Sequence, residues 1–229
     1  MSIICDNTSI QLFIHPIHEV VSEEIRRTGT FYEISFLNYI AEHYCNQHEI
    51  IDIGANIGNH STYFAEYFNC SRIHAFEPHP VNLNILHKNI DRYGDKCVIY
   101  DVALSNNNGE MTLFNSCANN YGGFSLHAYK NSSSFVVRDT IPVKTLDSFN
   151  LKNITMIKID VENHENEVLE GSKKTIMHNR PIIFLENLYH GFPAIQPDIN
   201  IHADFFRSVN YTKADSNILG SYMDLWIPL

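Results

Sequence analysis

The sequence is poor in the features that mark disulfide scaffolds, zinc ribbons and membrane proteins. Its five cysteines (Cys5, Cys45, Cys70, Cys97 and Cys117) are widely spaced and odd in number, with no C-x-x-C pair. This pattern argues against a disulfide framework or a zinc site. No apolar run approaches the roughly 18 residues of a membrane span, and the first residues lack the basic and apolar segments of a signal peptide. We therefore expect a soluble, cytoplasmic protein with reduced thiols and no membrane span.

Basic residues are also scarce. The chain has 16 Lys and Arg against 26 Asp and Glu, which gives a formal net charge of −10. Proteins that bind a phosphate backbone usually present a basic face, so the composition argues against a nucleic-acid partner. No G-x-x-x-x-G-K-[ST] motif follows any predicted strand and no Y-x-x-x-K pair occurs. Both absences argue against nucleoside triphosphate binding and reductase chemistry.

What the sequence does contain is a regular alternation of strand and helix patterns over 229 residues. Strands are predicted at 49–53, 72–77, from 97 onward, at 155–160, 182–186 and 224–229, and helices at 59–68, 81–94, 165–177 and near 199–208. This alternation predicts an α/β fold, a parallel sheet with helices on both faces. We expect a single domain over 1–229, with an N-terminal strand and helix extension at 1–47 and a β-rich insertion at about 105–143.

The stretch IIDIGANIGNHSTYF, residues 50–64, ends a buried strand in a turn that holds Gly54 and Gly58. Glycine permits positive φ and lets the backbone approach a ligand closely. A helix that opens there presents unpaired N–H groups, so the stretch predicts a small-molecule site. Its D-x-G-x-x-x-G spacing departs from the dinucleotide pattern G-x-G-x-x-G, which disfavours a nicotinamide-dependent oxidoreductase.

An acidic residue stands at the end of each strand that points toward the same crevice: Asp52, Glu77, Asp101, Asp160 and Glu186. In an open α/β sheet, ligands bind beyond the carboxyl ends of the strands. One such carboxylate can be a solvated helix cap, but five together favour a binding site.

Glu77 lies 19 residues after Gly58, where nucleoside-binding folds place the acid that accepts both ribose hydroxyls. The spacing therefore predicts a ligand with an unmodified ribose. Asp101 and the backbone of Val102 are placed to contact an adenine edge.

Four motifs in order resemble the FkbM-type S-adenosylmethionine-dependent methyltransferases. They are D-x-G-A-N-x-G-N-x-S from Asp52, F-E-P from Phe76, A-L-S-x-x-x-G from Ala103 and K-I-D-V-E-x-H-E-x-x-V-L-x-G from Lys158. The resemblance covers about residues 25–187 and implies a class I Rossmann-like sheet of order 3-2-1-4-5-7-6 with strand 7 antiparallel. The chain departs at Asn163, where the family usually has glycine, although Asn tolerates the left-handed conformation.

The resemblance also implies the cofactor S-adenosyl-L-methionine, with S-adenosyl-L-homocysteine as product. The methionine end is then lined by the glycine turn, the ribose is held by Glu77, and Glu33 in GTFYE is a further candidate because the family often has an acid there. The predicted cofactor-binding residues are Glu33, Asp52, Gly54, Ala55, Asn56, Gly58, Asn59, Glu77, Pro78, Asp101, Val102 and Asp160.

Methyl transfer from a sulfonium to a hydroxyl needs an in-line approach and removal of the hydroxyl proton. Positioning can supply roughly 7–11 kcal/mol of the barrier, and a general base roughly 10²–10⁴-fold in rate. His164 is the natural base, because imidazole titrates near neutral pH. If His164 is instead a helix-start residue bonded to backbone or to Glu186, then Asp160 or Glu186 takes the proton. The pattern leaves the base open among these three.

The acceptor is expected to contact Glu162, Tyr121, Tyr189 and His190, with the aromatic residues as a lid over a sugar ring. The same aromatic residues can instead close the edge of the core. Asp160, Glu186 and Asn187 could hold Mg²⁺, as in catechol-type methyltransferases, but no metal site is predicted.

The resemblance implies O-methylation of a sugar or natural-product hydroxyl, and we expect a carbohydrate acceptor in glycan biosynthesis. Association with glycosyltransferases and oligomeric state are left open. One alternative is N-methylation of a nucleobase, weakened because DVEN stands after the fourth strand in place of [DNS]-P-P-[YFW], or of another small molecule. The other is a non-catalytic S-adenosylmethionine-binding module of a glycan-assembly system.

Overall fold

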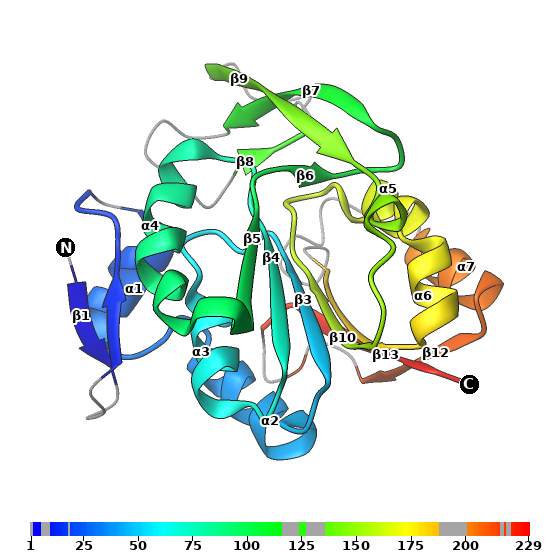
Figure 1. The fold of residues 1–229 in the computed structure, drawn as a ribbon, viewed down its shortest axis with the longest axis horizontal. Helices are drawn as coiled ribbons and strands as arrows, with labels where there is room; N and C mark the ends of the chain where they lie inside the picture. Colours follow the sequence, from blue (N-terminus) through cyan, green and yellow to red (C-terminus); the bar gives the residue numbers. More distant parts are fainter. Residues whose placement is uncertain are drawn as a thin grey trace.

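A twisted seven-stranded sheet forms the centre of the protein (Figure 1). The computed structural model describes residues 2–5, 10–17, 19–115, 124–126, 136–187, 201–215, 218 and 221–229. The central strands are β3 (Glu49–Ile53), β4 (Arg72–Phe76), β5 (Cys97–Tyr100), β10 (Ile154–Ile159), β11 (Ile182–Glu186), β12 (Tyr211–Asp215) and β13 (Met223–Pro228). Their spatial order is β12-β13-β11-β10-β3-β4-β5, and only β13 runs antiparallel to its neighbours. Renumbered from 1 to 7 along the chain, these strands lie in the order 3-2-1-4-5-7-6.

Helices cover both faces of this sheet, and the side chains of β3 show why (Figure 1). Ile50 packs into the cluster formed with α2 and α3, whereas Ile51 and Ile53 pack into the cluster formed with α5, α6 and α7. Successive strand residues point to opposite faces, and a sheet buried on both faces therefore needs a continuous apolar run. The helices are α1 (Val20–Thr28), α2 (Ile34–Tyr44), α3 (Asn59–Tyr67), α4 (Pro80–Ile90), α5 (Glu165–Gly171), α6 (Lys173–Asn179) and α7 (Ile201–Ser208).

The helix predicted at 165–177 is two helices, α5 and α6, which meet at Ser172. At this break the Ser172 hydroxyl donates to the Val168 carbonyl at 2.6 Å. Gly171 lies so close to the backbone of Ser105 that a Cβ there would be 2.0 Å from the Ser105 carbonyl oxygen. The end of α5 thus lies against a connection between two strands of a second sheet.

A second sheet of order β6-β9-β7-β8 lies across the end of the central sheet and coincides with the expected insertion (Figure 1). Its strands are β6 (Ala103–Leu104), β7 (Gly109–Asn115), β8 (Phe124–Ser125) and β9 (Val136–Lys144). A hairpin of β1 (Ser2–Cys5) and β2 (Ile10–Phe13) precedes α1, and two short 3-10 helices, η1 (Asp91–Lys96) and η2 (Leu146–Phe149), complete the described elements. The second sheet thus covers the edge where the parallel strands end.

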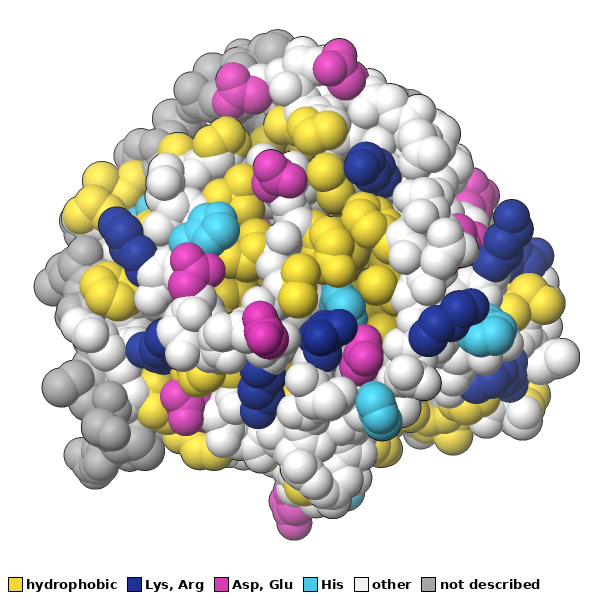
Figure 2. Space-filling view, in the orientation of Figure 1, with side chains coloured by type: hydrophobic (Ala, Val, Ile, Leu, Met, Phe, Trp, Pro, Cys, Tyr) yellow, Lys and Arg dark blue, Asp and Glu magenta, His cyan; other side chains and the backbone are white. Residues whose placement is uncertain are grey.

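The surface in Figure 2 mixes the two signs of charge. Lys and Arg side chains are interspersed with Asp and Glu around a central group of hydrophobic side chains. Among the described helices, none combines the length and apolar character that crossing a bilayer would require.

Candidate active site

A pocket opens at the carboxyl ends of the central parallel strands, beneath the second sheet. Its walls come from the ends of β3, β4, β10 and β11, from α1, and from apolar residues of the second sheet such as Leu113 and Leu126. Ten of the predicted site residues line it: Glu33, Gly54, Asn56, Glu77, Pro78, Val102, Asp160, Glu162, His164 and Glu186. This is the position where open α/β sheets bind ligands.

The glycine turn after β3 is fixed by close backbone contacts. Gly54 has φ +75°, and a Cβ there would lie 1.8 Å from the carbonyl oxygen of Asp160. Its N–H donates to the Phe76 carbonyl at 3.0 Å. Gly58 has φ +83°, and a Cβ there would lie 2.7 Å from Cδ1 of Leu86. Both positions therefore favour glycine for backbone conformation, and Gly54 also requires it for space, because its neighbour is backbone and not a movable side chain.

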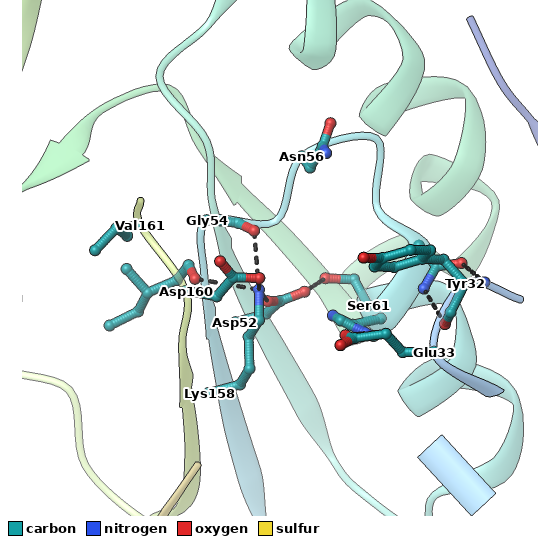
Figure 3. Close-up of polar contacts among 12 residues, drawn as sticks. Tyr32, Glu33, Asp52, Gly54, Asn56, Ser61, Lys158, Asp160 and Val161 are labelled. Atoms are coloured by element: carbon teal, nitrogen blue, oxygen red, sulfur yellow. Dashed lines mark hydrogen bonds and ion pairs between the residues drawn. The ribbon is translucent and has the colours of Figure 1, made fainter. Parts of the chain in front are cut away.

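A buried ion cluster ties β10 to this turn (Figure 3). Lys158 Nζ lies 3.3 Å from carboxylate oxygens of both Asp52 and Asp160, and it donates to the Gly54 carbonyl at 3.0 Å. Burial opposes the charge on Lys158, but the carboxylates of Asp160 and Asp52 outweigh it and raise the pKa of the amine. Asp52 also accepts a 2.6 Å hydrogen bond from Ser61. Because Asp52 is fully buried behind the turn, it supports the pocket and does not line it.

Glu77, at the end of β4, is held in the pocket wall by hydrogen bonds to both of its oxygens. Oε2 accepts from the backbone N–H of Asn56 at 2.9 Å, and Oε1 accepts from the N–H of His79 at 2.9 Å and from Asn82 at 3.3 Å. Burial raises the pKa of Glu77 to about 7, against these hydrogen bonds. Asn56 Oδ1 is buried beside it and accepts no hydrogen bond from any residue that the structure describes. These acceptors suit a ligand that brings hydroxyl or N–H donors.

Four further carboxylates from separate elements line the same pocket: Glu33 before α2, Asp160 and Glu162 after β10, and Glu186 at the end of β11. Burial raises the pKa of Glu162 to about 8 and that of Glu186 well above its usual range, and the charge of Asp160 acts in the same direction. Burial also disfavours the ionised form of Asp160, but Lys158 and further contacts hold its pKa below the usual range. No Lys or Arg is among the described residues that line the pocket.

His164 lines the pocket but is almost entirely buried, with 1% of its surface exposed. Its Nε2 lies 3.0 Å from the Ser105 hydroxyl and its Nδ1 lies 3.6 Å from Glu167 Oε2. Both ring nitrogens thus face polar groups of the protein. The sequence analysis allowed for a helix-start histidine bonded to backbone or to Glu186, and the structure adds Ser105 and Glu167 as its neighbours.

The methyltransferase FkbM domain matches residues 52–213, which is most of the chain. The chain belongs to the FkbM methyltransferase family. The four motifs of the sequence all fall within the matched range, and residues of the glycine turn, the F-E-P segment and the K-I-D-V-E segment line one pocket.

A curated relative of this chain is distant in sequence. The hexuronic acid methyltransferase AglP of Haloferax volcanii is 28% identical over 120 residues, which cover 52% of this chain and 48% of that protein. The chain thus spans about half the length of this curated relative.

Two solved structures share the fold. The FkbM methyltransferase of Methylobacillus flagellatus KT superposes with a TM-score of 0.58 at 18% identity, covering 79% of this chain and 43% of that one. A Staphylococcus aureus protein provisionally assigned as a caffeoyl-CoA O-methyltransferase gives 0.55 at 16% identity, covering 93% of both chains. At these identities the likeness shows a class I, Rossmann-like methyltransferase fold and no more.

Several predicted site residues do not line this pocket. Ala55 and Gly58 lie within the turn, Asp101 is exposed, and the Asn59 side chain bonds the N–H and carbonyl of Tyr32 at 3.0 and 3.1 Å. Tyr121, Tyr189 and His190 lie outside the described residues. The role of each remains a prediction.

Of the three residues considered as magnesium ligands, only two line the pocket. Asp160 and Glu186 line the pocket, but the Asn187 amide donates to Asp224 at 2.9 Å. Within the described ranges no group of three or more His, Cys, Asp or Glu side chains is arranged to hold a metal ion.

The pocket is also lined by residues that were not predicted from the sequence. Tyr32 lines it next to Glu33, and burial together with the nearby carboxylates raises the pKa of this phenol. Tyr222, with φ +60°, lines it from the segment before β13. Lys158 belongs to the K-I-D-V-E motif, but the sequence did not predict its place in the buried ion cluster. Its position two residues before Asp160 was the available signal, because alternate residues of a strand share a face.

Proposed function

We propose that this protein is an S-adenosylmethionine-dependent O-methyltransferase that modifies a hydroxyl of a sugar or glycan. The observation that carries the proposal is that one pocket is lined by two groups of acids with different partners, which we call its nucleoside end and its acceptor end. Glu77 and the glycine turn form an end suited to a nucleoside, and Asp160, Glu162 and Glu186 form an end that can take up a proton.

The residues present fit the proposed cofactor. Gly54 leaves room where a Cβ would collide with Asp160, Asn56 offers a buried acceptor without a partner among the described residues, and Glu77 offers a carboxylate for ribose hydroxyls. When bound, S-adenosylmethionine supplies a methyl group on a positively charged sulfur. The carboxylates at the far end of the pocket favour that positive charge, because opposite charges attract strongly where water is excluded.

A sugar acceptor is supported by the relative from Haloferax volcanii, which is named a hexuronic acid methyltransferase. The charge of this pocket points to a different kind of sugar. Asp160, whose pKa is held below its usual range, would repel a carboxylate, and no Lys or Arg of the described lining offsets that charge. We therefore infer an acceptor without a carboxylate next to the methylated oxygen.

The same carboxylates support a second candidate, N-methylation of an amine, because an ammonium group would be attracted to this end of the pocket. An amino sugar offers both kinds of acceptor atom. The position of the methyl group in its product separates the two candidates.

The first experiment is a calorimetric titration with S-adenosylhomocysteine, with NADH alongside and with and without Mg²⁺. We expect micromolar binding of S-adenosylhomocysteine alone. Failure to bind it, or a preference for NADH, would overturn the cofactor assignment.

The second experiment incubates the protein with S-adenosylmethionine carrying a labelled methyl group and three matched acceptors: methyl glucoside, glucosamine and glucuronate. We expect label on the oxygen of the first two and little on the third. A preference for glucuronate would contradict the inferred acceptor class, and label on nitrogen would favour the second candidate.

A further inference from the structure

The turn that follows β10 has an unusual backbone. Glu162 has φ +54° and Asn163 has φ +74°, so two consecutive non-glycine residues are left-handed. Residues held in such conformations persist where the surrounding structure over-determines them, and they cluster at functional sites. The sequence analysis allowed for a left-handed Asn163 but did not expect the same of Glu162.

Three hydrogen bonds hold this turn from both sides. Glu165 Oε1 accepts from the N–H groups of Val161 and Asn163 at 3.3 and 3.2 Å. From the second sheet, the Ser125 hydroxyl donates to the Glu162 carbonyl at 2.6 Å. The central fold and the covering sheet thus both fix the backbone that carries the Glu162 side chain at the pocket wall.

We propose that Glu162 is the general base of the reaction and that His164 is a positioning residue. Glu162 lines the pocket, and its backbone carbonyl is hydrogen-bonded to Ser125 of the second sheet. His164 instead lies against Ser105 and Glu167, and so links the start of α5 to the connection between β6 and β7 of the second sheet. The inference rests on the proposed function, since it names the group that receives the acceptor's proton.

In the proposed step, the acceptor hydroxyl oxygen forms a bond to the methyl carbon as its O–H proton passes to the Glu162 carboxylate. The electron pair of the broken carbon–sulfur bond stays on sulfur, which becomes a neutral thioether. The net products are the methyl ether, S-adenosylhomocysteine and a protonated Glu162, which returns its proton to solvent when the products leave.

The groups around Glu162 support this role. It lines the pocket together with Asp160 after β10, Glu186 from β11 and Tyr32, and the charges of Glu165 on α5 and Lys158 on β10 also act on it. Burial, together with the charges of Asp160 and Glu165, raises its pKa to about 8, although Lys158 acts in the opposite direction. A base works best when its pKa lies near the operating pH, and a bound sulfonium charge would bring this one down toward neutrality.

The first test needs no acceptor. In protein labelled with ¹³C at the Glu carboxyl carbon, we expect a resonance that titrates well above the ordinary range of glutamate, near pH 8. It should be absent in Glu162→Gln and retained in Glu170→Gln, which changes an exposed glutamate on α5. If no resonance lost in Glu162→Gln titrates above pH 6, the proposal is overturned.

The second test is kinetic and uses the best of the three sugar acceptors. We expect Glu162→Gln to lower kcat by about 10²–10⁴-fold, the usual contribution of a general base. It should leave the affinity for S-adenosylhomocysteine unchanged and abolish the rise of kcat/KM with pH. Formate should restore part of the turnover of Glu162→Ala, which a merely structural role would not allow.

Two variants distinguish the role of the Glu162 carboxylate from the role of the turn that carries it. Asn163→Gly removes side-chain strain and keeps the carboxylate, so near-normal turnover is expected. His164→Gln should retain the pH dependence of the wild-type protein. Normal turnover in Glu162→Gln, or loss of the pH dependence in His164→Gln alone, would overturn the assignment. Failure of the proposed function would appear separately, as absence of S-adenosylhomocysteine binding in the wild-type protein.

Discussion

The two ends of the pocket are both acidic, yet they are built in different ways. At the nucleoside end a single carboxylate, Glu77, receives backbone hydrogen bonds from Asn56 and His79. At the acceptor end Asp160, Glu162 and Glu186 raise or lower one another's pKa values, and the buried cation Lys158 lies behind them. The first end is arranged to hold a ligand in one geometry. The second end keeps several ionisable groups close together, where they can take part in proton transfer.

The comparison also distinguishes residues that support the pocket from residues that would take part in the reaction. Lys158, Asp52 and Gly54 hold the two ends at a fixed spacing, because the Lys158 amine contacts both carboxylates and the carbonyl of the glycine turn. Variants in this support should disturb both ends, and variants in one end should leave the other intact.

The largest effect is expected from Lys158→Met, which removes the buried cation and leaves two carboxylates facing each other. Breaking a buried ion pair by removing one partner costs about 3–5 kcal/mol. We expect a loss of this size in the free energy of unfolding, measured with urea, together with weaker binding of S-adenosylhomocysteine. Lys174→Met, which changes an exposed lysine on α6, is the matched control. Equal stability of the two variants would contradict the supporting role of the ion cluster.

Gly54→Ala should lower the free energy of unfolding somewhat less than Lys158→Met does. The added Cβ would meet the Asp160 carbonyl at 1.8 Å, and overpacking of this kind costs about 1–3 kcal/mol, occasionally more. Gly29→Ala is the control, because Gly29 also has positive φ, +70°, but a Cβ there would meet nothing within 4 Å. We expect circular dichroism melts to show a larger loss for Gly54→Ala, and only this variant to lose affinity for S-adenosylhomocysteine. If both variants behave alike, the close approach is not what requires glycine at position 54.

Glu77→Gln should break the nucleoside end alone. Hydrogen bonds to a charged group contribute about 1.5–3 kcal/mol, so we expect a loss of about 10–100-fold in affinity for S-adenosylhomocysteine by calorimetry. Asp101→Asn, at an exposed position outside the pocket lining, should change affinity far less. Asp101 is predicted from the sequence to contact the adenine, so a comparable loss in both variants would support that prediction.

The smallest effect is expected in the pH dependence of stability without ligand. The pKa values of Glu77, Glu162 and Glu165 are raised to about 7, 8 and 7, so between about pH 5 and 8 the folded protein binds more protons than the unfolded chain. Because of these groups, the free energy of unfolding falls as pH rises from about 5 to 8. We expect Glu162→Gln to become more stable relative to wild type from pH 5 to pH 8 in urea unfolding.

Glu170→Gln should show no such trend relative to wild type, because it changes an exposed residue. A difference between Glu162→Gln and wild type that stays constant from pH 5 to pH 8 would mean that the Glu162 carboxyl titrates normally. The contrast between the two ends of the pocket would then disappear.

Much of the central sheet could be predicted from local patterns. The strands at 49–53 and 182–186 agree with β3 and β11 residue for residue, because a continuous apolar run bounded by turn residues signals a strand buried on both faces. The strand β12 was not located, since its sequence YTKAD is short and mostly polar. The break between α5 and α6 was also missed, because it depends on contact between Gly171 and Ser105, which are far apart in the chain.

The sequence by itself determined the family, the fold class and the set of acidic residues at the strand ends, because these depend on motifs and on periodicity along the chain. Only the tertiary structure decided how each acid is used. Asp52 became a buried support, Glu77 a hydrogen-bonded wall residue, and Glu162 a partly buried carboxyl on a left-handed turn. The physical reason is that burial, neighbouring charge and hydrogen bonds set the pKa of a carboxyl, and each arises from residues that are distant in sequence.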